Sequence, residues 1–309
     1  MDFDIFIHIL IAAIAAGTPF VYAALGELIT EKSGVLNLGV EGMMLVGAIS
    51  GFIAMAKTGS ILVAVLCGMS AGALMAGIFA VLTLTLMANQ VASGLALTIF
   101  GVGLSAFLGL NYTSIALPGV PELHIPMLSN IPVVGQLFFS HDILIYCSGG
   151  LFAVISWFLY KSKSGLILRG IGEAPKSAHA LGYNVIRIRY MAVLFGGAMA
   201  GLGGTYLSIA YTPMWVEGMV AGRGWVSLAL VVFATWRPAR VMLGAYLFGA
   251  ITIAQFHVQG FGIDIPAQLL SMLPYVATIV MLVFISRDKN TIRLNSPASL
   301  GITYHPNVQ

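Results

Sequence analysis

GVLNLGVEGMMLVGA, residues 34–48, is an apolar stretch with two groups that a lipid-facing helix would not contain. They are the amide of Asn37 and the carboxylate of Glu41, and a polar lead-in, GELITEKS (26–33), precedes them. An ionisable group at membrane depth is costly and normally faces the protein interior or an aqueous path. The stretch therefore predicts a membrane protein packed around a polar, glycine-rich segment.

Composition places the whole chain in the same class. Of its 309 residues, 59% are hydrophobic and 8% are charged, whereas soluble domains have roughly 25% charged residues. Apolar runs of about 20 residues match the thickness of a bilayer core. These runs lie at residues 5–26, 35–56, 61–88, 91–110, 143–160, 190–211, 225–236, 241–258 and 266–286. We therefore predict an all-α, polytopic transmembrane bundle of about nine to ten spans, in which the short seventh run starts earlier or forms half of a broken helix.

The positions of lysine and arginine predict the orientation. Residues 161–189 contain six basic residues and one acid, whereas residues 111–142, a segment of similar length, contain neither lysine nor arginine. The first segment is expected in the cytoplasm and the second outside. Counting spans from there places the N-terminus outside and the C-terminus inside. Residues 1–290 form a single transmembrane domain in this interpretation, and residues 291–309 form a polar, solvated tail.

A weak internal repeat relates residues 34–39 (GVLNLG) to residues 224–229 (GWVSLA). Each begins at a glycine, has a small polar residue three places later (Asn37 and Ser227) and starts an apolar run. In the predicted orientation the two copies enter the membrane from opposite sides, as in inverted repeats whose interface holds a transport path. Chance similarity of two apolar runs is the competing explanation.

The basic loop contains one short predicted helix, at about residues 173–181. Glu173 and Pro175 are typical of a helix start, and Gly182 is suited to end the helix in the left-handed conformation. Such a helix could lie on the membrane surface or dock a cytosolic partner. From these residues alone, an ordinary basic loop is the preferred interpretation.

Polar residues within the apolar runs are candidates for lining a solute path. They are Asn89, Gln90, Ser93, Thr98, Ser227 and Gln255. For the first three, hydrogen bonding between helices is an equal alternative. Asn37 and Glu41 are four residues apart and are expected to share a helix face. There they could line the path, but we favour a structural role in bracing the repeat.

The sequence contains no pattern that predicts catalysis or a bound group. The phosphate-binding motif G-x-x-x-x-G-K-[ST] is absent, and the six histidines are scattered along the chain. We therefore expect no enzymatic activity, no cofactor, no metal site and no nucleic-acid partner. The two cysteines, Cys67 and Cys147, lie in apolar runs, which argues against a disulfide framework.

Four motifs give the chain a family resemblance. They are ITEKSGVLNLGVEGMMLVGA (29–48), ANQVASGLALTIFGVGLS (88–105), LRGIGEAPKSAHALGYNVIRIRYMAVLFGGAMAGLGGTYL (168–207) and MVAGRGWVSLALVVFATWRP (219–238). In order and spacing they resemble permease subunits of bacterial ABC importers for simple sugars, nucleosides and branched-chain amino acids. The resemblance covers about residues 20–285. One departure is Ala234, where those permeases usually have glycine, and we expect it to change local packing.

The resemblance implies that the chain is half of an ATP-driven alternating-access importer in a bacterial cell membrane. The implied partners are a second permease subunit, identical or related, a cytosolic ATP-binding subunit and an extracytoplasmic substrate-binding protein. The short helix would then be the coupling helix, seated in a groove of the ATPase. Its residues are Glu173, Ala174, Pro175, Lys176, Ser177, Ala178, His179, Ala180 and Leu181, followed by Gly182.

Nucleosides are the solutes that the resemblance favours. A simple sugar or another small polar solute is the alternative within the same class. An ion-coupled secondary transporter is the alternative from another class, and Glu41 would then be a proton or ion site.

Overall fold

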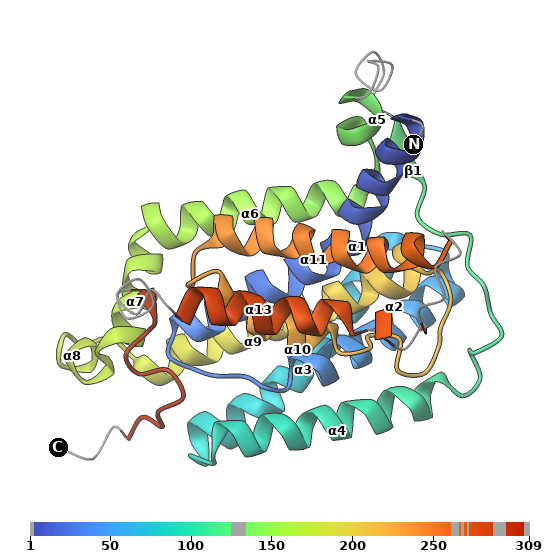
Figure 1. The fold of residues 1–309 in the computed structure, drawn as a ribbon. Coiled ribbons are helices and arrows are strands. Elements are labelled where there is room, and N and C mark those ends of the chain that lie inside the picture. Colours follow the sequence, from blue (N-terminus) through green and yellow to red (C-terminus); the bar gives the residue numbers. More distant parts are fainter. Residues whose placement is uncertain are drawn as a thin grey trace.

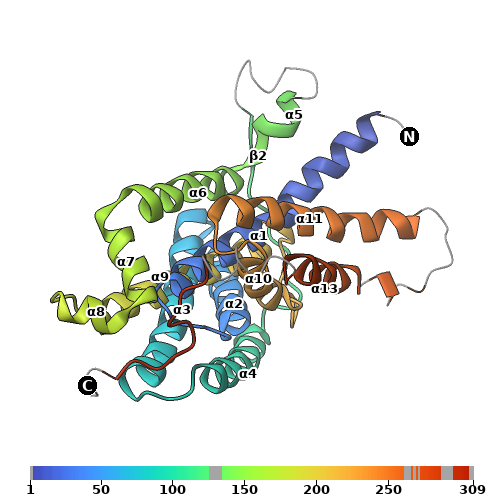
Figure 2. The same cartoon turned by 60° about the vertical axis from the view of Figure 1, so that its left-hand side comes forward.

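The computed structural model describes residues 3–124, 134–260, 266, 269–270, 272–286 and 295–305. This part of the chain is almost wholly helical, and its long helices lie side by side (Figure 1). Helices α7 (Lys163–Glu173) and α8 (Pro175–Ala180) lie with the C-terminus at one end of the bundle, which we call the α8 end (Figures 1 and 2).

Six helices of the described residues are long and apolar enough to cross a membrane, so the chain is a multi-pass membrane protein. They are α1 (Phe3–Lys32), α2 (Val40–Thr58), α3 (Ile61–Ala80) with the π-helix η1 (Val81–Thr85), α4 (Gln90–Gly109), α6 (Ile143–Lys161), and α9 (Val185–Tyr206) with the π-helix η2 (Leu207–Tyr211). The predicted all-α bundle is confirmed.

The remaining elements are shorter or lie nearer the C-terminus. They are β1 (Glu122–His124), α5 (Val134–Phe139), β2 (Ser140–Asp142), α10 (Arg223–Phe233), α11 (Pro238–Gly260) and α13 (Leu273–Ser286). Strands β1 and β2 pair antiparallel. Each of the nine predicted apolar runs overlaps at least one helix of the described residues. The seventh overlaps α10, which has 11 residues and is too short to cross a bilayer core by itself.

Helix α9 lies at the centre of the bundle, packed against α1, α2 and α3. A Cβ atom added to Gly201 would lie 2.2 Å from the carbonyl oxygen of Gly68, and one added to Gly72 would lie 2.2 Å from that of Gly197. Small residues permit such close approach of helices in lipid. Since Gly201 meets Gly68 while Gly197 meets Gly72, α3 and α9 cross antiparallel through two G-x-x-x-G motifs.

Helices α3 and α9, which cross here, also end in the same way. Both α3 and α9 end in a five-residue π-helix, followed by a non-helical link and a further helix, α4 or α10. The two copies of the six-residue repeat predicted from sequence have different structures. Residues 34–39 form an irregular link, whereas residues 224–229 lie inside α10. The two segments therefore do not correspond in structure, and an inverted repeat of the chain stays a prediction.

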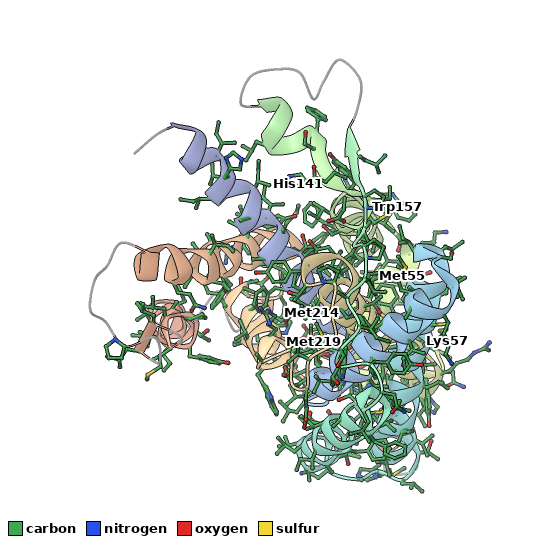
Figure 3. All side chains as sticks on the ribbon, turned by 90° about the vertical axis from the view of Figure 1, so that its right-hand side faces the viewer. Met55, Lys57, His141, Trp157, Met214 and Met219 are labelled. Carbon is green, nitrogen blue, oxygen red and sulfur yellow. The ribbon has the colours of Figure 1, made fainter. Side chains whose placement is uncertain are left out.

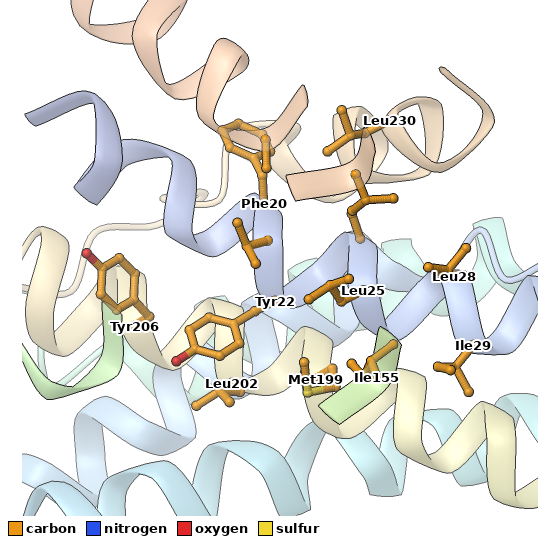
Figure 4. Packing of buried hydrophobic residues seen from close by; sticks show 14 of the residues in the cluster. Phe20, Tyr22, Leu25, Leu28, Ile29, Ile155, Met199, Leu202, Tyr206 and Leu230 are labelled. Carbon is orange, nitrogen blue, oxygen red and sulfur yellow. The ribbon is translucent and has the colours of Figure 1, made fainter. Parts of the chain in front are cut away.

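Apolar side chains of α1 fill the core beside α9 (Figure 4). Tyr22 and Leu25 are fully buried and belong to one cluster with Met199 and Tyr206 of α9. Because lipid is as apolar as these side chains, close packing of the two helices stabilises this contact more than removal from water does.

Helix α2 begins at Val40, five residues later than predicted. Gly34 has φ +90°, a value that favours glycine. The backbone N–H of Gly39 donates to Oδ1 of Asn37 at 2.9 Å, an Asx-type turn that competes with helix formation. Asn37 thus lies outside the helix, and the prediction that it shares a helix face with Glu41 is wrong.

The predicted helix at residues 173–181 is present but starts later. Glu173 ends α7, and α8 begins at Pro175. Between them Ala174 has φ −141° and ψ 78°, because a residue before proline is pushed out of the helical region. The prediction that Glu173 opens this helix is therefore wrong. Gly182 has φ +89° and ends the helical segment as predicted.

Residues 295–305 pack on the α8 end, so for them the prediction of a solvated tail is wrong. The backbone N–H of Ser299 donates to the carbonyl oxygen of Gly172 at 2.9 Å. Gly172 lies in the last turn of α7, where carbonyl groups lack partners within the helix. Residues 291–294 and 306–309 lie outside the described residues.

Candidate functional site

Among the non-helical links of the described residues, two lead into helices whose first turns are joined by Glu41. The first link is residues 33–39, between α1 and α2, and the second link is residues 212–222, between η2 and α10. Broken helices at a repeat interface are a typical setting for a transport path. The polar residues around these two links are therefore the candidate site.

Side chains of α1 and α2 hold the first link from within. Glu27 of α1 is 1% exposed, and its Oε1 accepts a hydrogen bond from the backbone N–H of Asn37 at 3.2 Å. The side-chain amide of Asn37 is fully buried and contacts the sulfur of Met43 at 3.4 Å. Asn37 thus orders the turn, which agrees with the structural role favoured for it.

Helix α4 holds the link from a second side. Oε1 of Gln90 accepts from the backbone N–H of Leu36 at 2.8 Å, and the hydroxyl of Thr98 donates to the carbonyl oxygen of Leu38 at 3.0 Å. Both side chains are buried, with exposures of 3% and 7%. An irregular buried segment needs partners for its backbone groups, and α4 supplies two of them.

Charged and aromatic side chains complete the contacts at the α8 end. Arg189 of α9 is 1% exposed, and its Nε donates to the carbonyl oxygen of Ser33 at 3.0 Å. The indole N–H of Trp236, in the turn after α10, donates to the carboxylate of Glu31 in the last turn of α1. The first link is thus fixed to α1, α4 and α9. The last turn of α1, which leads into this link, is in turn bound to the turn after α10 through Glu31 and Trp236.

Glu41 joins the two links. Its Oε1 accepts from the backbone N–H of Gly222 at 2.8 Å, and its Oε2 accepts from that of Gly224 at 2.7 Å. Gly222 is the N-cap of α10 and has no side chain with which to cap it. A carboxylate at a helix N-terminus satisfies unpaired N–H groups and the positive end of the helix dipole. Glu41, in the first turn of α2, therefore caps α10 from another helix.

The second link is held partly by short turns of its own backbone. Bonds of this kind join Met214 to Thr212, Met219 to Val216, and Ala221 to Gly218. The N–H of Leu117 donates to the carbonyl oxygen of Pro213 at 2.8 Å, and the hydroxyl of Tyr275 donates to the carbonyl oxygen of Ala221 at 3.0 Å. The guanidinium of Arg223 donates to the carbonyl oxygens of Met219 at 3.0 Å and Val220 at 3.2 Å.

Much of the second link faces outward. Met214, Val216 and Glu217 are exposed, while Trp215 is buried at 1% exposure. Figure 3 views the end opposite α8, where Met214 and Met219 are labelled, and Met219 packs against the cluster of Ile49, Phe52 and Trp215. The second link therefore differs from the first, which is buried along most of its length.

The six predicted path residues lie in different surroundings. Gln90 and Thr98 bind the first link. Asn89 is exposed and caps α4, its Oδ1 accepting from the N–H of Ala92 at 3.0 Å. Ser93 is half-buried. Ser227 is fully buried, and its hydroxyl donates to the carbonyl oxygen of Arg223 within α10 at 2.8 Å. Gln255 lies on α11 and is half-buried. Their role in a solute path stays a prediction.

The loop at the α8 end presents an exposed surface. Within α8 only Ala178 is buried, whereas Leu181, just after the helix, is 77% exposed and Tyr183 is 40% exposed. A groove of about 360 Å³ lies beside α8. It is lined by His179, Gly182, Tyr183, Asn184, Val185, Ile186 and Tyr304.

The sequence did not single out several residues that hold the first link. They are Glu27, Glu31, Arg189 and Trp236. The two acids lie in an apolar helix, and the rule that marks Glu41 as an unusual membrane carboxylate marks them equally. Arg189 was counted only as one charge of a basic loop. No pattern in the sequence identified its burial.

Comparison with known proteins gives several related chains. A family model described as branched-chain amino acid transport system / permease component matches residues 9–285. The putative glucose ABC transporter permease protein TsgC13 of Haloferax volcanii is 38% identical over 316 residues, which cover 95% of this chain and 96% of that protein. No solved structure gives a significant match.

Two further relatives carry nucleoside names. The nucleoside ABC transporter permease protein NupC of Lactococcus lactis is 34% identical, over 86% of this chain and 88% of that protein. The guanosine ABC transporter permease protein NupQ of Bacillus subtilis is 32% identical, over 95% of each chain.

Proposed function

Because this chain belongs to the family of branched-chain amino acid transport system permease components, we propose that it forms one of two membrane halves of a nucleoside importer. Family membership confirms the resemblance seen in the four motifs and identifies a transport subunit of an ABC importer, not an enzyme. Such a component works with ATPase and binding-protein partners. An ion-coupled secondary transporter is accordingly set aside.

One observation carries the mechanism: the Glu41 carboxylate joins the starts of two broken helices, α2 and α10, inside the bundle. Broken helices of this kind line transport paths because their ends offer backbone groups at membrane depth. Glu41 holds these ends together, so its role here is structural. We place the solute path beside this junction, with Gln90, Thr98 and Ser227 on the elements that surround it.

Names of relatives support nucleosides as the solute. Two relatives, at 34% and 32% identity, are named for nucleoside and guanosine transport. A glucose-like sugar is the second candidate, favoured by the 38% identity to a putative glucose permease. A nucleoside contains a sugar and a base, so the two candidates share hydroxyl groups and differ in the aromatic ring.

For the ATPase partner we propose the exposed surface of α8 and Leu181 as the docking site. A short helix at the end of a basic loop, with an exposed leucine beside it, fits a groove of a cytosolic subunit. This assignment places the α8 end in the cytoplasm, in agreement with the basic residues of 161–189. Residues 295–305, which pack on the α8 end, would lie on the same side.

Competition uptake tests the solute. Cells that express the complete importer would take up labelled uridine, and unlabelled nucleosides or glucose would be added in excess. Competition by guanosine and adenosine, with none by glucose or ribose, is the expected result. Uptake of labelled glucose in the same cells, with no uptake of labelled uridine, would select the second candidate. Uptake that continues without ATP hydrolysis, in vesicles with a catalytically inactive ATPase partner, would contradict ATP-driven import.

A further inference from the structure

The C-terminal segment, residues 295–305, contacts both the first link and residues 161–189, the basic loop that contains α7 and α8 and that we call the coupling loop. The proposed transport mechanism gives this segment no role. Two donors of Ser299, its backbone N–H and its hydroxyl, bind the carbonyl oxygen of Gly172 at 2.9 and 2.7 Å. Gly172 lies in the last turn of α7, two residues before Ala174 and the start of α8. The segment therefore holds the last turn of α7, just before α8 begins.

Tyr304 holds α8 itself. Its ring lies 6.4 Å from the ring of His179 in a T-shaped arrangement. It also packs against a small apolar cluster of Ile171, Ala178 and Val185. Ala178 is the buried residue of α8, so this cluster is the apolar attachment of α8 to the rest of the bundle.

Arg189 joins the segment to the first link. Its Nη2 donates to the hydroxyl oxygen of Ser299 at 2.9 Å, and its Nε donates to the carbonyl oxygen of Ser33 at 3.0 Å. The guanidinium group lies 5.8 Å from the centre of the Tyr304 ring, within the range of a cation–π contact. A second hydrogen bond joins the segment to the end of α1, beside the first link: Nζ of Lys32 donates to the carbonyl oxygen of Asn295 at 2.7 Å.

We propose that residues 295–305 transmit movement of α8 to the first link, with Arg189 as the positioning residue that connects them. The path of contacts runs from His179 to Tyr304, then through the guanidinium of Arg189 to Ser33. A planar guanidinium with donors in fixed directions is suited to hold two partners in one geometry. The inference rests on the proposed function, because it requires an ATPase subunit that moves α8.

The test compares Tyr304→Ala and Ser299→Ala with Ile302→Ala in the complete importer, reconstituted in proteoliposomes with its ATPase and binding protein. Ile302 lies in the same segment and is 60% exposed, so its replacement is a matched control. The first two variants should raise the ATP hydrolysed per nucleoside imported by about fivefold or more, since couplings of that size are typical of linked sites. The control and Tyr304→Phe, which keeps the ring, should retain the wild-type ratio.

Several outcomes would overturn the proposal. An unchanged ratio in both Tyr304→Ala and Ser299→Ala is one of them. A rise that Ile302→Ala or Tyr304→Phe shares is another, because it would reflect general damage to the segment. Size-exclusion chromatography and copurification of the ATPase show that each variant is folded and assembled. If the wild-type importer shows no ATP-driven uptake, the proposed function fails before any variant is compared.

Discussion

Residues 33–39 and 212–222 both lead from a long helix into a helix that begins inside the bundle, but different contacts hold them. Side chains from other elements bind the backbone of the first link: Glu27, Gln90, Thr98 and Arg189 each contribute one hydrogen bond. The second link is largely exposed, and three bonds join its own residues, while Leu117, Tyr275, Arg223 and Glu41 bind it from outside. Glu41, in the first turn of α2, binds both the second link and the start of α10.

This difference separates a fixed end of the transporter from a deformable one. A segment whose backbone is bonded to three helices moves only when those helices move. The second link is largely exposed and changes shape at lower cost, because segments with few buried contacts have the lowest local stability. We infer that the first link moves with the coupling loop as one body, while the second link adapts.

Replacement of Glu41 should have the largest effect, because it breaks the connection between the two links. Glu41→Ala leaves the N–H groups of Gly222 and Gly224 without their charged acceptor. Hydrogen bonds to charged groups contribute about 1.5–3 kcal/mol each, so the free energy of unfolding should fall by about 3 kcal/mol or more. Thermal unfolding of the purified permease in detergent measures this loss.

Glu41→Gln is the matched variant for this position. Its amide keeps one acceptor oxygen and loses the charge, so we expect a loss of stability smaller than that of Glu41→Ala. Equal stability of Glu41→Ala and the wild type would contradict the bracing role. A folded Glu41→Gln variant that changes which solutes compete for uptake would return Glu41 to the solute path.

Two glycine replacements compare the links directly. Gly34 and Gly218 have φ +90° and +69°, so alanine at either position costs about 1–2 kcal/mol of backbone strain. In the first link, a Cβ atom at Gly34 would also lie 2.3 Å from the Ser299 hydroxyl oxygen and 2.7 Å from Nη2 of Arg189. In the second link, a Cβ atom at Gly218 would meet no atom within 4 Å. Gly34→Ala should therefore lower the melting temperature clearly more than Gly218→Ala. Equal shifts would mean that the contacts around the first link are looser than described.

Neighbouring residues at the start of α4 give a smaller contrast. Gln90→Ala leaves the N–H of Leu36 in the first link without its acceptor, and an unsatisfied buried group costs about 1–3 kcal/mol. Asn89→Ala removes only the exposed cap of α4, which costs about 1 kcal/mol. Uptake assays with several nucleosides accompany the unfolding measurement. A change of solute preference in Asn89→Ala alone would favour path lining for that residue.

A substitution in the second link should have the smallest effect. Ala221 has φ +50°, a conformation that costs an alanine about 1–2 kcal/mol. Glycine removes this strain but adds backbone entropy in the unfolded chain, worth about 0.5–1 kcal/mol. Ala221→Gly should therefore raise the free energy of unfolding by no more than about 1.5 kcal/mol. A lower melting temperature would show that the side chain of Ala221 contributes packing.

The sequence predicted the membrane class and most helices because apolar length alone determines them. It also predicted Gly182 as a helix stop, since a left-handed residue at that point favours glycine. It misplaced the starts of α2 and α8, where local features, the Asn37 turn and Pro175, override the apolar pattern.

Contacts between distant residues could not be predicted from the sequence. Glu41 and Gly222 are 181 positions apart, and Arg189 and Ser33 are 156 apart. A single sequence carries no signal for such pairs. The sequence marked Glu41 as an unusual carboxylate, but it did not identify Gly222 and Gly224 as the groups that Glu41 binds. Nor did it indicate that Ser299 of the polar tail would be buried.

Hydrogen–deuterium exchange of the assembled importer tests the contrast between the links most directly. The importer would be compared without nucleotide and with ATP trapped by vanadate. We predict that amides of residues 33–39 stay protected in both states, while those of residues 212–222 exchange faster and change between the states. Exchange in the first link as fast as in the second, in either state, would contradict a fixed link joined to the coupling loop.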